Sequence, residues 1–267
     1  MHPILNIAIR AARMAGNLIA KYYENPDASD VTQKGNNDFV TNVDREAKRL
    51  IFEVIRKSYP KHGILDKESS KLTDAVTDTQ WIIDPLNGKI NFTKRFPHFA
   101  VSIAVRIKER TEVAVVYDPM RNELFTASRG HGAQLNSYRL RVSTAHDLDG
   151  KILATGFPFE QKQHANSYMT LVRKLFIQCT DFRCTGSAAL DLAYVAAGRV
   201  NGFFEIGLKP WDFSSGELLV REAGGLVTDF AGCNNHLRSG NIVAGNPRVV
   251  KALLLSMRDE LSEVLRQ

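Results

Sequence analysis

Apolar residues recur at helical spacing in two stretches near the amino terminus. From Pro3 to Tyr23 they fall three or four positions apart and leave a polar face opposite, which predicts an amphipathic helix. The same spacing runs from Val43 to Ser58, and Pro60 ends that second helix. The segment between them, Asn25 to Asn37, is rich in turn residues. Two helices joined by a turn-rich segment are therefore expected to open the chain.

From Ala100 the pattern changes from helical spacing to β-rich runs. Three such runs, VSIAVRI, EVAVVYD and ELFTASR, are joined by short polar segments at 108–110 and 119–122. Short β-rich runs with turn residues between them are typical of an antiparallel meander. We therefore expect three sequential strands here.

Beyond residue 150, short strands alternate with helices. Strands are expected at Lys151–Thr155, Gly202–Glu205 and Leu226–Asp229, and helices at Ala165–Phe176, Ser187–Ala197, Ser215–Ala223 and Pro247–Arg266. This alternation favours a layered α/β architecture. Since no repeat or linker interrupts it, we expect a single domain over residues 1–267, made of two packed halves that meet near 145–150.

The composition narrows the class of protein. Hydrophobic residues make up 44% and charged residues 24%, as in ordinary globular proteins. No apolar run reaches the roughly 18 residues of a membrane span, and the amino terminus does not read as a secretory signal. The three cysteines, which have no CxxC spacing, predict reduced thiols that are buried or without a role, not a zinc site. We expect a cytoplasmic protein.

The charge balance is basic. The formal net charge is +6 and the isoelectric point is about 9.2. A basic surface favours RNA, DNA or acidic partners. However, the lysines and arginines are spread along the chain without a block of five or six. Contact with RNA therefore stays open on this feature.

The segment with the most specific chemistry is WIIDPLNGKINF, from Trp81 to Phe92. It resembles WIIDP-[LI]-DG-TT-NF, the central signature of the inositol monophosphatase family. The resemblance extends over nearly the whole chain, in KGNNDFVTNVD (34–44), YPKHGILDKES (59–69), GSAALDLAYVAAGRVNGFFE (186–205), WDFSSGELLVREAGG (211–225) and NIVAGNP (241–247). It implies an inositol-monophosphatase-like αβαβα layered sandwich and a tendency to form homodimers.

The family resemblance also implies a set of site residues. Family enzymes are Mg²⁺-dependent phosphatases of small polyol phosphates, in which a metal-bound water attacks the phosphate monoester. The resemblance places metal-binding carboxylates at positions 67, 84, 87 and 212, and a main-chain carbonyl at 86. It also places a water-orienting threonine at 89, beside an aspartate at 44. The residues that this sequence retains are Asp44, Asp84, Leu86 and Asp212.

The sequence departs from the family pattern at the chemistry itself. Lys67 replaces a glutamate, Asn87 an aspartate and Lys89 a threonine, and Ile90 replaces the second threonine of the signature. Asp66 and Glu68 flank the lost glutamate, but neighbours on an extended segment point to opposite faces, so we expect neither to replace it.

The charges of the retained aspartates and of the two lysines indicate how strongly the altered site binds Mg²⁺. Asp84 and Asp212 contribute two negative charges, and Lys67 and Lys89 contribute two positive charges. An attraction of roughly 4 kcal/mol between unit charges ~4 Å apart, at an effective dielectric constant of ~20, lets an ammonium compete with a hydrated divalent ion. We therefore expect a self-neutralised site that binds Mg²⁺ poorly. The alternative is that the lysines swing into solvent and leave a weak site of Asp84, Asn87 and Asp212 with residual phosphatase activity.

Other family positions are intact. The resemblance assigns substrate contacts to Gly88, Gly186, Ser187, Ala188 and Glu205. A helix cap is the competing interpretation of Ser187. The RGHG run at 129–132 is half of a dinucleotide fingerprint, but it falls in a turn of the meander and is discounted. The histidines lack metal-ligand spacing, and His62 and His98 are expected at the surface or in loops.

Two functions follow from the resemblance. Three segments, MHPILNIAIRAAR, KRFPHFAVSIAVRIK and GFFEIGLKPWDF, are similar to an enterobacterial branch of the family that acts in ribosomal-RNA transcription antitermination. The first function is such a factor, which binds antitermination factors, RNA polymerase and, as an open question, RNA. The second is a Mg²⁺-dependent inositol-1-phosphate phosphatase. The altered residues lie at the positions that the resemblance assigns to metal and water, while the sequence pattern of the rest of the fold is intact. This favours the binding role.

Overall fold

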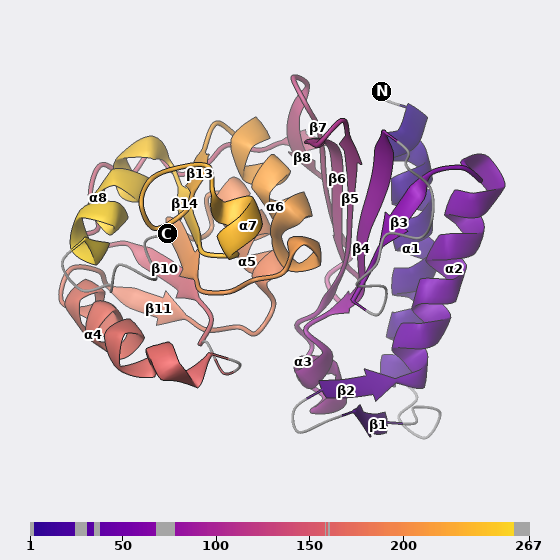
Figure 1. Cartoon of the computed structure of the whole chain (residues 1–267), viewed down its shortest axis with the longest axis horizontal. Helices are drawn as coiled ribbons and strands as arrows, with labels where there is room; N and C mark the ends of the chain where they lie inside the picture. Colours follow the sequence, from indigo (N-terminus) through magenta and orange to yellow (C-terminus); the bar gives the residue numbers. More distant parts are fainter. Residues whose placement is uncertain are drawn as a thin grey trace.

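The computed structural model describes residues 3–24, 31–34, 38–67, 78–157, 159 and 161–258. Within them, the two larger β-sheets alternate with three layers of helices (Figure 1). The layers run from helices at the amino-terminal side, through a seven-stranded sheet, a central helical layer and a five-stranded sheet, to a second outer layer of helices. This is the αβαβα sandwich expected from the sequence.

The first outer layer consists of α1 (Pro3–Glu24) and α2 (Asn42–Ser58), as predicted. Their apolar faces pack on the seven-stranded sheet in one buried cluster. The face of α1 is built largely from alanines and Gly16, which allow close approach. A Cβ at Gly16 would lie only 2.5 Å from the Tyr117 ring, so a side chain there would push the helix off the sheet.

The seven-stranded sheet has the order β3-β4-β5-β6-β7-β8-β9. Its strands are β3 (Gly63–Leu65), β4 (Thr79–Asn87), β5 (Ala100–Ile107), β6 (Arg110–Asp118), β7 (Glu123–Ser128), β8 (Gly132–Leu135) and β9 (Tyr138–Arg139). The antiparallel pairing of β5, β6 and β7 confirms the predicted meander. The RGHG run spans the turn from β7 to β8, as expected.

Strand β4 pairs irregularly with β5 near its end. The register is regular up to Asp84 and shifts before Asn87. Pro85 lies inside this step and has no N–H for the ladder, which suits an irregular position. After Gly88, which has a left-handed φ of 91°, the chain enters α3 (Lys89–Thr93). A Cβ at Gly88 would lie 2.9 Å from the His98 carbonyl oxygen, so the tight turn requires glycine.

The five-stranded sheet has the order β11-β10-β12-β14-β13. Its strands are β10 (Ile152–Thr155), β11 (Asp181–Arg183), β12 (Gly202–Glu205), β13 (Leu226–Thr228) and β14 (Ile242–Gly245). Helices α5 (Ala188–Ala196) and α6 (Pro210–Glu222) form the central layer and share a core with both sheets. The outer face packs in a third cluster with α4 (Ala165–Phe176) and α8 (Pro247–Met257).

The remaining described elements are short. They are the hairpin β1 (Val31–Lys34) and β2 (Asp38–Thr41), the 3₁₀ turn η2 (Lys162–His164) and α7 (His236–Ser239). Strand β1 falls within the segment predicted to be rich in turns, and the rest of that segment, 25–30 and 35–37, lies outside the described residues. The prediction of a single domain over 1–267 stays a prediction.

Two helix boundaries differ from the predictions. Helix α6 begins at Pro210, five residues before the expected Ser215. Proline is well suited to a first helical turn, and Asp212 accepts a hydrogen bond from the Lys209 N–H at 3.0 Å, which caps the helix. Helix α8 ends at Met257, and the expected continuation beyond residue 258 lies outside the described residues.

The cysteines are free thiols, as predicted, but not uniformly buried. Cys179 is half-buried, whereas Cys184 and Cys233 are exposed. For the two exposed thiols, the absence of a role stays a prediction.

Candidate functional site

The fold brings the predicted chemistry-bearing residues together where β4, α3, α2 and α6 meet. We call this group the lysine–aspartate cluster. Its members are Asp44, Lys67, Asp84, Asn87, Lys89 and Asp212. Three come from the β4–α3 segment, and the others from α2, from the residues after β3, and from α6. Residues more than a hundred positions apart in sequence thus converge at one place.

Lys67 bridges two of the aspartates. Its Nζ lies 3.0 Å from Asp84 Oδ2 and 3.8 Å from Asp212 Oδ1. Asp84 has no exposed surface, so its charge depends on these neighbours. Burial disfavours the ammonium of Lys67, but attraction to Asp84 and Asp212 and the hydrogen bond to Asp84 outweigh it and raise the pKa of Lys67. Lys67 therefore stays charged at neutral pH.

Lys89 binds the third aspartate. Its Nζ lies 2.8 Å from Asp44 Oδ2, with only 12% of the Lys89 side chain exposed. This contact contradicts the alternative in which Lys89 swings into solvent. Burial raises the pKa of Asp44, although the nearby Lys89 ammonium acts in the opposite direction.

The observed ion pairs change the net charge that the sequence predicted for the site. The expected net charge of zero counted Asp84 and Asp212 against the two lysines. In the structure, however, Lys89 forms its ion pair with Asp44. Three aspartates and two lysines leave the cluster with one formal negative charge when all are ionised. The site is therefore nearly, but not fully, self-neutralised.

Asn87 joins both aspartates to the central helical layer. Its Nδ2 donates to Asp84 Oδ2 at 2.8 Å and to Asp212 Oδ1 at 3.4 Å. Its Oδ1 accepts from Ser187 Oγ at 2.7 Å and from the Ala189 N–H at 3.3 Å. Carboxylates only accept hydrogen bonds, so the amide NH₂ must face them. An aspartate in this position would instead set two carboxylate oxygens against each other.

The donor set does not fit Mg²⁺. Within the described part of the chain, no group of three or more His, Cys, Asp or Glu side chains is placed to hold a metal ion. The oxygens that would serve already contact the Lys67 ammonium and the Asn87 amide. Leu86 is buried and its N–H donates to Asp84 Oδ1 at 3.3 Å, while the metal role of its carbonyl stays a prediction. Weak Mg²⁺ binding likewise stays a prediction.

The predicted substrate positions lie beside the cluster. Gly186 has a φ of 79°, and a Cβ there would lie 3.3 Å from the Asn91 amide. Ser187 and Ala188 follow at the start of α5. Ser187 is the N-cap residue of α5, but its side chain makes no capping hydrogen bond and donates to Asn87 instead. Contact of these residues with a substrate stays a prediction.

A buried acid near these positions was missed by sequence reasoning. Asp191 lies on α5 and is 2% exposed, and its pKa is raised to about 7 by burial, despite a 2.8 Å hydrogen bond from Thr185. The predicted substrate residue Glu205 lies on β12. Burial, followed by repulsion from Asp191 and Asp212, raises its pKa well above the usual range. Asp191 carries no motif of its own, since it sits inside an alanine-rich helical pattern.

The ion pair between Lys48 and Asp66 was also missed by sequence reasoning. Lys48 Nζ forms an ion pair with the buried Asp66 carboxylate. This agrees with the expectation that Asp66 does not replace the missing glutamate. Glu68 lies outside the described residues. Lys48 is one helical turn beyond Asp44 on α2, and this spacing was the available signal.

The two histidines considered in the sequence have structural positions. His62 is half-buried, and its Nδ1 accepts a hydrogen bond from Trp81 Nε1 at 3.1 Å. His98 lies in the loop before β5, as expected, and is 5% exposed, so its ring is shielded from solvent. Burial lowers the pKa of His98 to about 4, helped by Arg121 and opposed by Asp118. It is therefore neutral at pH 7.

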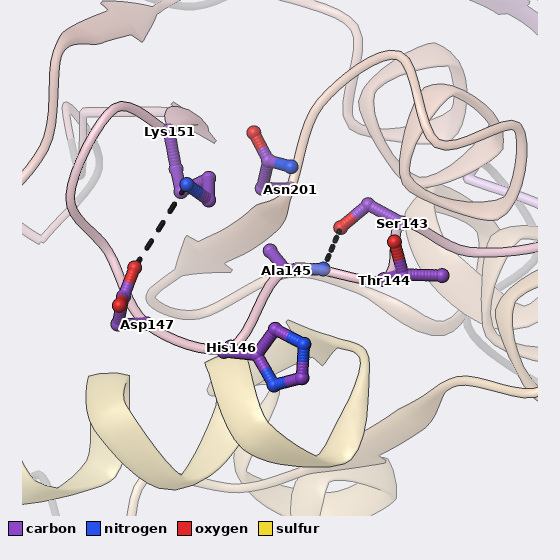
Figure 2. Close-up of a pocket in the computed structure, with 7 residues that line it drawn as sticks. All are labelled: Ser143, Thr144, Ala145, His146, Asp147, Lys151 and Asn201. Carbon is purple, nitrogen blue, oxygen red and sulfur yellow. Dashed lines mark hydrogen bonds and ion pairs between the residues drawn. The ribbon is translucent and has the colours of Figure 1, made fainter.

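A surface pocket of about 400 Å³ lies elsewhere, in the connection from β9 to β10. Figure 2 shows its lining, in which Lys151 reaches toward Asp147 and the Ala145 N–H toward Ser143 Oγ. None of its lining residues belongs to the lysine–aspartate cluster.

Comparison with known proteins agrees with this geometry. The profile of the inositol monophosphatase family matches residues 1–263. The chain belongs to this family. It is 71% identical to the Nus factor SuhB of Escherichia coli K12 over 267 residues, which is 100% of both chains. It is 61% identical to the Nus factor SuhB of Vibrio cholerae over 259 residues, which is 97% of both chains.

Solved structures of family members share the fold. The extragenic suppressor protein SuhB of Bartonella henselae superimposes with a TM-score of 0.92 at 39% identity, covering 97% of this chain and 99% of its own. Inositol monophosphatase from Anabaena (Nostoc) gives a TM-score of 0.85 at 34% identity, covering 97% and 96%. Among the described helices, none has the length and apolar character to cross a membrane.

Proposed function

We propose that this chain is a Nus-type factor that acts in ribosomal-RNA transcription antitermination, with phosphatase chemistry lost or weak. The observation that carries the proposal is its 71% identity, over the full length of both chains, to the E. coli Nus factor SuhB. At this identity an intact scaffold and similar binding surfaces are expected.

The geometry of the lysine–aspartate cluster supports the second half of the proposal. Lys67 and Lys89 place ammonium groups against Asp84 and Asp44, and the Asn87 amide also binds Asp84. Phosphatase chemistry in this family requires hard oxygen ligands that remain available to Mg²⁺. In contrast, the three hydrophobic clusters that hold the layers together are continuous. Altered chemistry on a retained scaffold favours a binding role.

The partners follow from the same proposal. They are antitermination factors and RNA polymerase in the cytoplasm, bound through the outer surface of the chain as a monomer or homodimer. The basic charge of +6 is compatible with RNA contact as well.

The test is genetic replacement followed by purified binding. The gene is expressed in E. coli lacking SuhB, and read-through of a ribosomal-RNA leader reporter is measured beside a strain with its own SuhB. We expect restored read-through, and binding of the purified chain to purified antitermination factors. A folded protein that restores nothing and binds none of the purified factors would contradict the proposal.

The second candidate function is a Mg²⁺-dependent inositol-1-phosphate phosphatase. Retention of three aspartates at one place, Asp44, Asp84 and Asp212, favours it, since family enzymes use acids at these positions. Phosphate release from inositol-1-phosphate at millimolar Mg²⁺ decides between the two, and turnover comparable with that of an intact family enzyme would support this candidate.

A further inference from the structure

Lys67 occupies an unusual place in the architecture. It lies just after β3, and its ammonium contacts Asp84 on β4 and Asp212 on α6. Strand β4 belongs to the seven-stranded sheet, while α6 belongs to the central helical layer (Figure 1). One side chain therefore connects three separate pieces of chain.

We infer that Lys67 is a built-in cation that locks β4, α6 and the segment after β3 together, so that the fold around the cluster is independent of divalent ions. The inference goes beyond the proposed function, because it holds whichever partner the chain binds. It rests on the mismatch between the donor set and Mg²⁺.

All four oxygens of the Asp84 and Asp212 carboxylates already have partners within the chain. Asp84 Oδ2 contacts both Lys67 Nζ and Asn87 Nδ2, and Asp84 Oδ1 accepts the Leu86 N–H. Asp212 Oδ1 faces the same ammonium and amide, and its Oδ2 accepts the Lys209 N–H. Each oxygen of the two carboxylates thus has a positive or hydrogen-bearing neighbour.

A divalent ion would have to break this arrangement. Mg²⁺ requires oxygen ligands at about 2.0–2.1 Å in near-octahedral geometry. To reach Asp84 it would displace the ammonium at 3.0 Å and turn the Asn87 NH₂ away from it. The displaced Lys67 would lose both ion pairs at once. The ammonium is part of the chain, so it has no concentration dependence and its occupancy does not vary with free Mg²⁺.

The experiment compares thermal unfolding of the full chain in EDTA and in millimolar MgCl₂, for wild type and Lys67→Met. The wild-type Tm should be the same in both buffers. In EDTA, Lys67→Met should lower the Tm by about 10 °C, because a buried carboxylate loses its cation. MgCl₂ should restore part of that loss in Lys67→Met, since removal of the ammonium opens Asp84 and Asp212 to the metal.

Lys151→Met is the matched control. The Lys151 side chain is 27% exposed, against 29% for Lys67, and it also has an aspartate partner at 3.8 Å. That partner, Asp147, is 68% exposed, whereas the Asp84 side chain is fully buried. Loss of an exposed ion pair changes stability little, so this variant should keep its Tm and ignore Mg²⁺.

Three results would overturn the inference. They are a wild-type Tm that rises with Mg²⁺ as much as that of Lys67→Met, a Lys67→Met chain as stable as wild type, and a destabilised Lys67→Met chain that ignores Mg²⁺. If Lys67→Met fails to fold, Lys67→Gln retains a hydrogen-bond donor without the charge and should give the same Mg²⁺ response. Binding to antitermination factors does not enter this test, so its failure is distinct from failure of the proposed function.

Discussion

Two groups of buried acids lie side by side in this protein and are stabilised differently. In the lysine–aspartate cluster, Asp44 and Asp84 each bind an ammonium. Next to it, Asp191 is 2% exposed and Glu205 is half-buried, and among the described residues neither has an ion-pair partner. Their pKa values are raised with no cation acting in the opposite direction, whereas Lys89 opposes the rise at Asp44. One group is thus stabilised by cations and the other by protons.

The difference coincides with the positions at which the sequence departs from the family signature. At the metal positions, the side chains supply the positive charge themselves. On the predicted substrate side, Glu205 and the glycine and serine that precede α5 match the family signature, and among the described residues no cation pairs with the acids. The two regions should therefore respond to different variables, Mg²⁺ and mutation in one case and pH in the other.

The largest effect is expected when the cluster is returned to the family pattern. Lys67→Glu, Asn87→Asp and Lys89→Thr together should restore Mg²⁺ binding and raise phosphate release from inositol-1-phosphate about a hundred-fold or more above a wild type that releases barely any. Single changes should raise phosphate release little, because each leaves a lysine or a missing ligand in a group that acts as a unit in the reaction. Calorimetry with Mg²⁺ and a phosphate-release assay measure both.

The same triple variant carries its own control. Binding to antitermination factors should be nearly unchanged if those partners use the outer surface. A folded triple variant that fails to bind Mg²⁺ would show that the scaffold, and not the three side chains, prevents the chemistry.

The next effect concerns the second ion pair. Lys89→Met leaves the Asp44 carboxylate, whose side chain is 6% exposed, without its ammonium, at a cost of about 3 kcal/mol near pH 7. The pKa of Asp44 is already raised by burial and rises further without Lys89, so a proton replaces the lost cation in acid. Stability from a raised carboxyl pKa is present at low pH and is lost as pH rises through the folded-state pKa.

The destabilisation by Lys89→Met should therefore grow from acid to neutral pH. Denaturant unfolding at several pH values measures it, with Lys151→Met as the reference. A loss of stability equal at every pH would mean that packing of the lysine stem, and not its charge, matters.

A smaller effect is expected at Asp191, in the group of acids that lacks an ammonium partner. Asp191 has a folded-state pKa of about 7, against 3.8 for the free side chain, so its protonated form is favoured in the folded state. Its contribution is therefore complete below about pH 4 and is lost as pH rises toward 7. Asp191→Asn keeps an acceptor for the Thr185 hydroxyl and removes the titration.

Asp191→Asn should be more stable than wild type by about 1–3 kcal/mol at pH 8. The advantage should vanish near pH 4, and denaturant midpoints at the two pH values give the comparison. Glu205 titrates in both proteins, and its pKa falls in the variant because one of the two carboxylates that repel it is gone. A variant less stable than wild type at pH 8 would show that Asp191 is ionised and satisfied by its surroundings.

The smallest effect tests the contact between the lysine–aspartate cluster and the start of α5. Ser187→Ala removes the 2.7 Å hydrogen bond to Asn87 Oδ1, which retains the Ala189 N–H, and should cost about 1 kcal/mol. In a double-mutant cycle with Asn87→Ala, the two changes should not add. Additive costs would mean that Ser187 acts elsewhere.

Much of the fold was predictable because it depends on local periodicity. Helix α4 has the predicted bounds, Ala165–Phe176, and α1, α2, the meander and β12 agree closely. The late prediction for α6 arose because Pro210 and Trp211 break the apolar spacing, although proline is favoured at that position.

The candidate site was predictable in its members but not in its pairing. The resemblance placed residue 89 beside Asp44, and in the structure Lys89 forms its ion pair with that aspartate. The charge sum was wrong because sequence order does not reveal which carboxylate each lysine reaches. The four hydrogen bonds of Asn87 and the burial of His98 depend on packing between layers, which no local pattern encodes.

The irregular step in β4 has a consequence for how such a site changes its chemistry. On a regular strand, Asp84 and Asn87 would point to opposite faces, since they are three residues apart. The shifted register lets their side chains meet at 2.8 Å. The direction of the two side chains and their charge are therefore determined separately. The backbone around Pro85 directs both side chains to one point, while their chemical identities decide which groups bind there. Substitution of side chains alone can therefore change which groups gather at this point, without rebuilding the strand.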